Sequence, residues 1–502
     1  MDTVLYTGSA FKTGAFMRES TRYRHKRFIT CLRLLNEENK VNSPFGPAER
    51  LKWIKPSGIR RFFAMANEMP DSINLSIGEP DFCPPNEVLN AGCEAAKEGK
   101  THYEPTNGIP ELREALAQKA FKEYGLKYDP SSEILITVGG TEAIFCALFG
   151  LINPGDEVLV PGFTFAATAM AVVVARGVPI WCEIDESMTI NPEDVEKKIT
   201  PRTKAIAPVH MSGYVCNMEA IMDIAKRHKL LVIEDCAQSC GSRFKGKRVG
   251  TIGNIGCFSI SSYKVTGGGE SGLVMTDDDK LFDRAQGWAE AGGLWRPDRF
   301  APARWKGELF SGVNYRMSEL EGTVELVQFR KMEAQLDRWR KNKKLIMSNL
   351  PAYKELRPRV IYDIDGEMGH SIGFFGRTAE EAEQLAHALS AEGVGAGTRG
   401  RSKSPDWHHY QYMEMIMNKV PATSDGCPWE CPKAGEAAKV KYSFDMCPNT
   451  IDILSRHVSA GVNQWWAEND CMKVAQAMTK VFDAFFTRDT KYDNWLSAVA
   501  SK

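Results

Sequence analysis

From residue 134 to residue 275 the chain alternates short β-rich runs with helical patterns, and this alternation limits the fold more than any other feature. It is typical of a mainly parallel sheet that helices cover on both faces. Helical spacing is clear in Thr141–Leu151, whose apolar residues recur on one face. We predict an α/β fold with a seven-stranded sheet, its strands at Ile134–Val138, Glu157–Val160, Val178–Cys182, Ala205–Val209, Leu230–Glu234, Cys257–Ser261 and Gly272–Met275.

The remainder of the chain divides around this region. A long charged helical pattern follows Ser318 and continues to about Asn349, before Pro351 breaks it. We predict a large α/β domain over residues 71–325, then a linking helix and a smaller C-terminal α+β domain over 326–502. Residues 1–70 show no comparable periodicity and form an N-terminal extension of unknown role.

Charge and hydropathy narrow the classes of partner. The formal net charge of the 502 residues is -1, so the chain lacks the basic surplus of a nucleic-acid or membrane-surface protein. Its longest strongly apolar run, Ala166–Ala175, is shorter than the roughly 20 residues of a spanning helix. We therefore expect small-molecule substrates, with no nucleic-acid or membrane partner.

Cysteines and histidines give weaker signals. Thirteen cysteines are scattered along the chain, which favours reduced thiols in the cytoplasm over a disulfide framework. Cys427 and Cys431 are close in sequence, but one such pair is weak evidence for a metal, and we assign no metal site. His408 and His409 are adjacent, so they would point in different directions, as surface or substrate-edge histidines.

Polar residues that follow the predicted strands are the candidates for binding, because ligands of open α/β sheets lie at the carboxyl ends of the strands. Gly139, Gly140 and Thr141 join the first strand to a helix. Free backbone N–H groups and the helix dipole at such a junction suit a phosphate dianion. The alternative is an ordinary turn in which Thr141 caps the helix.

Two further strand ends carry groups suited to pyridoxal 5′-phosphate (PLP). Asp235 follows a buried strand and needs a cationic partner; a protonated pyridine nitrogen would be one, and a local arginine is the alternative. Lys264 precedes the glycine-rich segment 267–272, where desolvation would lower the pKa of its amine toward the neutral nucleophile. Ser259 could present a hydroxyl to the phosphate, or could be a packing residue.

Longer motifs surround these residues. They are GDEVLVPGFTFAATA, ITPRTKAIAPVHMSG, VIEDCAQSCGSRFKGKRVGTIGNIGCFS with the Ser-to-Lys spacing that follows it, and GVNYRMSE. This pattern closely resembles the DegT-type sugar aminotransferases, which are fold-type I PLP-dependent enzymes. The resemblance implies PLP as cofactor and Lys264 as the residue that holds it in a Schiff base.

The same resemblance implies roles for the other residues. Asp235 would pair with the pyridinium nitrogen, Gln238 would lie near the ring hydroxyl, and Phe165 would stack on the ring, although a core aromatic is the alternative for Phe165. The phosphate would be held by Gly140, Thr141 and Ser259.

The resemblance also implies a homodimer with shared active sites, in which Asn314 reaches the phosphate of the neighbouring subunit. The earlier stretches INLSIGEPDF and HYEPTNGIPELREAL look like class I amino-acid aminotransferases. By that likeness Tyr103 would contact the phosphate of the partner subunit.

The function that the resemblance implies is transfer of an amino group from glutamate or glutamine to a keto sugar or keto cyclitol. Val265 and Ser271 depart from the family pattern, which usually has Asn and Gly there, so elimination, decarboxylation or carbon–carbon bond formation stays open, as does a non-catalytic PLP-binding homologue. An amino-acid substrate would require an arginine to clamp its carboxylate, and Arg377 and Arg399 are candidates.

Overall fold

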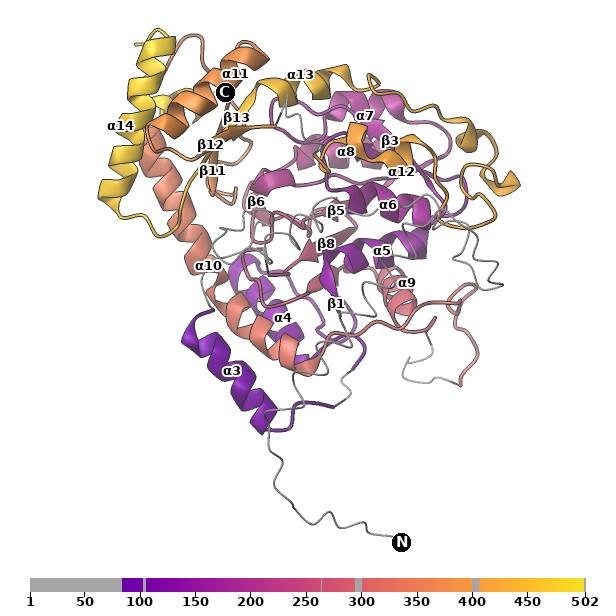
Figure 1. Ribbon diagram of the computed structural model, residues 1–502. Helices are drawn as coiled ribbons and strands as arrows, with labels where there is room; N and C mark the ends of the chain where they lie inside the picture. Colours follow the sequence, from indigo (N-terminus) through magenta and orange to yellow (C-terminus); the bar gives the residue numbers. More distant parts are fainter. Residues whose placement is uncertain (1–83, 103–104, 263, 294–299, 400–405, 501–502) are drawn as a thin grey trace, which may run out of the picture. The chain divides into compact units, whose positions relative to one another are not determined.

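A seven-stranded sheet forms the centre of the fold, and its strand order is β1-β9-β8-β5-β4-β2-β3 (Figure 1). Neighbouring strands from β3 to β8 run parallel, whereas β9 is antiparallel to both of its neighbours. The predicted mainly parallel sheet is confirmed, and all seven strands overlap the predicted runs, although β4 and β8 each begin and end two or three residues earlier than predicted. The strands are β1 (Ile134–Thr137), β2 (Glu157–Pro161), β3 (Val178–Cys182), β4 (Thr203–Ile206), β5 (Leu231–Asp235), β8 (Ile255–Ser259) and β9 (Gly272–Met275).

The computed structural model describes residues 84–102, 105–262, 264–293, 300–399 and 406–500. The N-terminal extension predicted at residues 1–70 lies outside the described residues, and so does Tyr103.

Alternating side chains of the buried strands supply two hydrophobic cores, one on each face of the sheet. In β1, Ile134 and Ile136 join one core and Leu135 joins the other; in β5, Val232 and Ile233 divide in the same way. Both faces are buried because helices cover both, which explains the continuous apolar runs of these strands. The first core is covered by α4 (Pro110–Tyr124), α8 (Met218–His228) and α10 (Glu319–Ser348), and the second by α5 (Gly139–Leu151), α6 (Ala166–Val174) and α9 (Asp279–Ala289).

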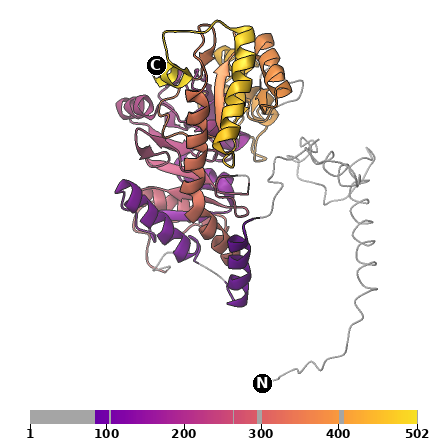
Figure 2. The same cartoon turned by 90° about the vertical axis from the view of Figure 1, so that its left-hand side faces the viewer.

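The predicted linking helix is α10, which leads from the large sheet to a second sheet (Figure 2). The side chain of Ser318 accepts a hydrogen bond from the backbone N–H of Glu321 and so begins the helix. Leu326 and Phe329 of α10 pack into the core of the large sheet, whereas Ile346 packs into the core of the second sheet. One helix therefore contributes to two cores.

The second sheet is antiparallel, with strand order β10-β11-β13-β12. Helices α11 and α14 contribute Leu385 and Phe482 to its core. This arrangement is the predicted smaller α+β part of the fold, while the domain boundary at residue 325 stays a prediction. The strands and helices are β10 (Arg357–Pro358), β11 (Ser371–Phe375), β12 (Ala396–Thr398), β13 (His457–Gly461), α11 (Ala379–Ala391), α13 (Pro448–Arg456), α14 (Glu468–Phe485) and α15 (Trp495–Ala500).

Short elements complete the described chain. They are α3 (Asn86–Lys97), α7 (Pro192–Lys198), α12 (Glu414–Met417), the strand pair β6 (Arg243–Phe244) and β7 (Lys247–Arg248), and the 3-10 helices η2 (Met211–Gly213), η3 (Tyr410–Tyr412) and η4 (Pro432–Lys439).

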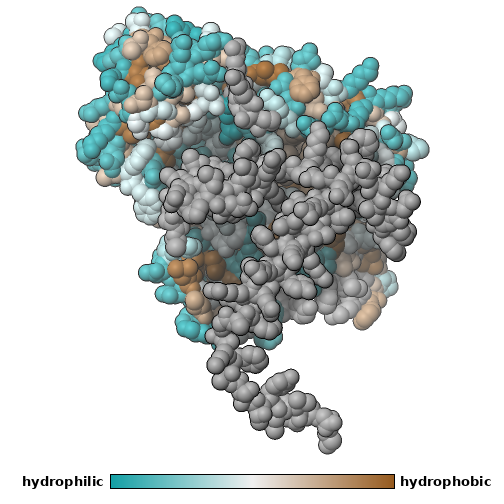
Figure 3. Space-filling model, in the orientation of Figure 1, coloured by the Kyte–Doolittle hydropathy of each residue, from teal (hydrophilic) through white to brown (hydrophobic). Residues whose placement is uncertain are grey.

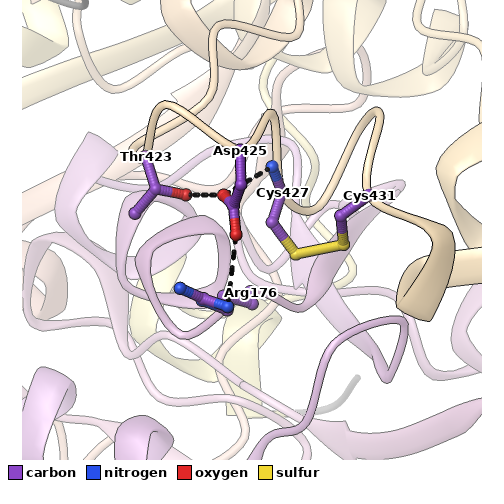
Figure 4. Close-up of a disulfide and its surroundings, with 5 residues drawn as sticks. All are labelled: Arg176, Thr423, Asp425, Cys427 and Cys431. Carbon is purple, nitrogen blue, oxygen red and sulfur yellow. Dashed lines mark hydrogen bonds and ion pairs between the residues drawn. A yellow bond between two sulfur atoms is a disulfide. The ribbon is translucent and has the colours of Figure 1, made fainter.

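A disulfide joins Cys427 to Cys431, so the prediction of reduced thiols is wrong for this pair. The local reason is visible in Figure 4, where Asp425 accepts hydrogen bonds from the hydroxyl of Thr423 and the backbone N–H of Cys427 and pairs with Arg176. The turn that these contacts hold brings the two sulfur atoms together. The other nine cysteines of the described residues are free, and the predicted cytoplasmic location stays a prediction.

No helix within the described ranges is long and apolar enough to cross a membrane. On the face shown in Figure 3, the described surface is mostly hydrophilic, with scattered hydrophobic residues. This distribution agrees with the near-neutral but charge-rich composition of the chain.

Candidate active site

Asp235 is the last residue of β5, and its carboxylate is held at the carboxyl end of the central sheet. One oxygen, Oδ2, accepts a hydrogen bond of 2.7 Å from the hydroxyl of Thr168, and Oδ1 accepts one of 3.0 Å from the backbone N–H of Ala237. Burial raises the pKa of the Asp235 carboxyl, while these hydrogen bonds and the positive charge of Lys264 oppose the rise. A further cation beside this carboxylate would keep it ionised.

Lys264 lies in the turn that follows β8. Its backbone N–H donates to the carbonyl of Ser261 at 2.8 Å, and its carbonyl accepts from the N–H of Gly267 at 3.2 Å. Burial lowers the pKa of the Lys264 amine, and the charge of Asp235 is the largest influence in the other direction. The charge of each group shifts the pKa of the other, as the predicted pairing of this lysine and aspartate with one cofactor requires.

Gly140 and Ser259 form a close contact between the first turn of α5 and the end of β8. A Cβ atom at Gly140 would lie 2.6 Å from the Cβ and 2.9 Å from the Cα of Ser259, so no larger residue fits. The Ser259 hydroxyl is 3.0 Å from that of Ser261, a second hydroxyl that the sequence did not single out. Val138 is the N-cap of α5, so Thr141 lies exposed in the first turn, and the alternative that it caps the helix is wrong.

This junction has the features that a phosphate needs. The backbone N–H groups of a helix N-terminus are unpaired within the helix, and the dipole favours an anion there. Thr141, Ser259 and Ser261 add hydroxyl donors next to the same turn. The residues predicted to hold the phosphate, Gly140 on α5 and Ser259 on β8, thus lie in contact although they are far apart in sequence.

Phe165 and Gln238 lie on segments that flank Asp235. Phe165 is the N-cap of α6 and 44% exposed, so its ring is available for stacking and is not part of the core. Gln238 accepts a hydrogen bond of 2.9 Å from the backbone N–H of Ser212 at Oε1, which leaves its amide NH₂ to donate. An NH₂ donor suits the oxygen of a ring hydroxyl.

Together these residues fit PLP. Asp235 could pair with its ring nitrogen, Phe165 could stack on its ring, and the Gln238 amide could donate to its hydroxyl. The turn around Gly140 and Ser259 suits its phosphate, and the Lys264 amine, with its lowered pKa, suits its aldehyde. Asn314, predicted to serve a neighbouring subunit, is exposed and pairs through its backbone with Glu290.

Thr168 is a site residue that sequence reasoning missed. It lies on α6, three residues after Phe165, and its hydroxyl also lies 2.9 Å from that of Thr164. Both threonines are fully buried. The four-residue spacing is the signal that the sequence contains, but only the tertiary structure shows that Thr168 contacts Asp235.

A second missed group surrounds Glu234, where the structure gathers His210, Glu234 and Cys236 within 4.8 Å, a grouping that could hold a metal ion. The carboxylate of Glu234 already accepts hydrogen bonds from the backbone N–H groups of Gly250 and Ile252 and lies 3.1 Å from His210 Nε2. These contacts satisfy a charge that would otherwise be buried alone. The group therefore fixes the end of β5, on which Asp235 lies.

The two candidate arginines are both paired. Arg377 donates to Glu381 at the start of α11, and Arg399 donates to Asp406 at 2.8 Å. Of the adjacent histidines, His409 is buried, so the prediction of a surface or substrate-edge residue is wrong for it. His408 is partly exposed, and its ring centroid lies 5.7 Å from that of Phe165.

Comparison with known proteins identifies the family of the chain. The pattern of the DegT/DnrJ/EryC1/StrS aminotransferase family matches residues 118–423. The chain belongs to the DegT/DnrJ/EryC1/StrS aminotransferase family. It is a PLP-dependent aminotransferase.

Relatives of this DegT-family enzyme act on different molecules, according to their names. It is 31% identical to L-glutamine:2-deoxy-scyllo-inosose aminotransferase of Micromonospora echinospora over 79% of this chain and 91% of the relative. It is 36% identical to GDP-perosamine synthase of Escherichia coli O157:H7 over 50% of this chain and 67% of the relative.

Solved structures support the fold of the DegT-family enzyme. The aminotransferase from Psychrobacter cryohalolentis superposes with a TM-score of 0.62 at 23% identity, over 81% of this chain and 99% of the other. The 3-amino-5-hydroxybenzoic acid synthase superposes with a TM-score of 0.61 at 23% identity, over 81% and 98%. Both show the fold-type I architecture that the sequence predicts.

Proposed function

We propose that this DegT-family enzyme transfers the amino group of glutamate or glutamine to a keto sugar or a keto cyclitol. The observation that carries the proposal is that Asp235, at the end of β5, and Lys264, in the turn after β8, influence each other electrostatically, while Ser259 at the end of β8 contacts Gly140. Bound PLP would supply an aldehyde for amines and a ring that accepts electrons from the carbon losing a proton. The chain's own residues would position that ring and move the proton.

Lys264 is proposed as the amine that holds the cofactor and as the base. Its lowered pKa increases the fraction of neutral amine, which is the form that can attack a carbonyl or accept a proton at Nζ. The backbone of the turn that carries Lys264 is held by two hydrogen bonds.

Asp235 is proposed as the partner of the cofactor's ring nitrogen. Thr168 and Ala237 each occupy one carboxylate oxygen and so orient it. The remaining lone pairs are free to accept an N–H from the ring. An ionised Asp235 would stabilise positive charge on that nitrogen, where the reaction needs it.

The acceptor class is proposed from two independent features. The relatives named above include a cyclitol aminotransferase and a nucleotide-sugar synthase, and a third, from Acidithiobacillus ferrooxidans, is named as a UDP-N-acetyl-3-dehydro-alpha-D-glucosamine 3-aminotransferase. In addition, Arg377 pairs with Glu381 and Arg399 pairs with Asp406, so the positive charge that would clamp an acceptor carboxylate is already partly neutralised. A polyhydroxylated ketone does not need such a clamp.

A homodimer is proposed from Asn314. Its side chain is exposed, while its backbone is fixed by pairing with Glu290, so it is presented outward at a defined position. A second copy of the chain could accept it next to the phosphate turn around Gly140. Sedimentation of the purified enzyme would measure this assembly.

The test follows the two halves of the reaction in the purified PLP-loaded enzyme. L-glutamine or L-glutamate is added first, and the visible absorbance of the cofactor should decline. One of three acceptors is then added: 2-deoxy-scyllo-inosose, UDP-N-acetyl-3-dehydro-glucosamine or 2-oxoglutarate. With either of the first two acceptors the absorbance should return, and an aminated cyclitol or sugar should be detected by mass spectrometry. 2-Oxoglutarate is the keto-acid reference and yields only glutamate.

Lys264→Ala is the critical variant, and Lys197→Ala, at an exposed position of α7, is its matched control. The first should abolish turnover, and the second should leave it unchanged. Full turnover by Lys264→Ala, or an unchanged absorbance of the wild type with both donors, would contradict the proposal. Release of carbon dioxide or of an elimination product would favour the other PLP reactions.

A further inference from the structure

The segment 408–410 lies against the loop that carries Phe165. Its backbone accepts a hydrogen bond of 2.8 Å from the N–H of Thr164 at the carbonyl of His408, and the N–H of Tyr410 donates to the carbonyl of Gly162 at 3.0 Å. The bridge between Phe163 and His409 has antiparallel geometry. This register fixes the position of His408 beside the exposed ring that we assign to the cofactor.

Asp406 holds the His408 ring in one orientation. Its Oδ1 accepts hydrogen bonds from the backbone N–H of His408 at 2.9 Å and from ring Nδ1 at 2.8 Å, while Oδ2 accepts from Arg399 at 2.8 Å. Although burial alone would raise the pKa of Asp406, the hydrogen bonds of His408 and the charge of Arg399 hold it well below its usual range. Asp406 is therefore an ionised acceptor, and Nδ1 carries the proton.

Because Nδ1 faces Asp406, the neutral ring of His408 would present the lone pair of Nε2 away from that carboxylate. The described residues give Nε2 no hydrogen bond, and 29% of the side chain is exposed. A lone pair held next to an open aromatic ring accepts a hydrogen bond from a hydroxyl group. Because Arg399 and Asp406 neutralise each other, the group has no excess positive charge to attract a carboxylate.

We propose that Nε2 of His408 binds a ring hydroxyl of the keto sugar or cyclitol acceptor, with Asp406 as its positioning residue. This inference rests on the proposed function, since it assigns a determinant of acceptor choice at the same site. His408 thereby selects polyhydroxylated ketones over keto acids. It takes no part in the half-reaction with the amino donor.

The experiment compares His408→Asn with the wild type in the PLP-loaded full chain. Asparagine can keep a donor near the position of Nδ1, for Asp406, but it has no atom at the position of Nε2. His387→Asn, on the exposed face of α11, is the matched control. The measured quantities are kcat/KM for 2-deoxy-scyllo-inosose, UDP-N-acetyl-3-dehydro-glucosamine and 2-oxoglutarate, and the rate of the donor half-reaction.

Loss of one hydroxyl hydrogen bond should lower the ratio of kcat/KM for the better polyol acceptor to that for 2-oxoglutarate by roughly 3- to 10-fold. The rate with glutamate or glutamine alone should stay unchanged. His408→Gln, which has an amide near the position of Nε2, should recover part of the ratio. An unchanged ratio, or an equal loss in both half-reactions, overturns the inference.

Binding measured by saturation-transfer NMR separates this inference from the proposed function. The wild type could transfer no amino group and still bind one of the two polyhydroxylated ketones. Weaker binding of that ketone to His408→Asn would then support the role of His408, although the proposed reaction has failed. If the wild type binds neither polyol, or if His408→Asn binds them equally well, the inference is overturned.

Discussion

Glu142 should make the stability of the cofactor-free protein depend on pH. It lies in the first turn of α5, is 8% exposed, and accepts a hydrogen bond of 2.6 Å from the backbone N–H of Val138. Burial raises the pKa of its carboxyl to about 7 from the ordinary 4.5, against the opposing effect of that hydrogen bond. Glu142→Gln keeps the shape and an acceptor oxygen but removes the titration.

The sign follows from the two pKa values. Between pH 4.5 and about 7 the unfolded chain releases the Glu142 proton while the folded chain keeps it, so the free energy of unfolding falls as pH rises. At about 1.36 kcal/mol for each pH unit, the burial penalty reaches about 3 kcal/mol above pH 7. Glu142→Gln lacks this penalty, so its advantage over the wild type should increase by about that amount from acid to neutral pH.

Urea unfolding of the two proteins, measured at intervals from pH 5 to pH 8 without PLP, tests this expectation. PLP is omitted because a phosphate bound at the same helix terminus would add its own charge. Glu114→Gln, at an exposed position of α4, is the control, and its free energy of unfolding should change with pH as that of the wild type does. If the free energy of unfolding of Glu142→Gln also changes with pH as that of the wild type does, burial does not raise the pKa of the Glu142 carboxyl and the reasoning is refuted.

Two other substitutions test the assembled site. Gly140→Ala would place a methyl group against Ser259, so PLP affinity measured by absorbance titration should fall by roughly 10-fold or more; unchanged affinity would contradict the close approach. Thr168→Val removes the hydroxyl whose hydrogen bond opposes the rise in the pKa of Asp235, so that pKa should rise further. The acidic limb of the profile of kcat against pH should therefore move to higher pH. Thr168→Ser should restore the wild-type profile, and a Thr168→Val profile that coincides with the wild type would show that the hydrogen bond has no such effect.

The helices and strands of this protein could be predicted well from local patterns. The seven strands are short apolar runs ended by glycine, proline or polar residues, and these signals depend on near neighbours in the chain. Lys264 and Asp235 could be identified in the same way, because each follows such a run and belongs to an extended motif. The small strands β6 and β7 were missed, since two-residue strands have no periodicity to detect.

Contacts between distant segments required the tertiary structure. Thr168 and Asp235 are 67 residues apart, and their hydrogen bond exists because the folded chain brings the first turn of α6 to the end of β5. The position of His408 next to Phe165 depends on the pairing of segments more than 240 residues apart, roughly the length of a whole domain. The sequence by itself thus determined which elements form and which residues bear reactive groups, because those properties arise from local periodicity and side-chain chemistry. Only the tertiary structure decided which hydrogen-bond and ion-pair partners those reactive groups have and how far each group is buried. Partners and burial depend on the packing of elements that are remote in the chain.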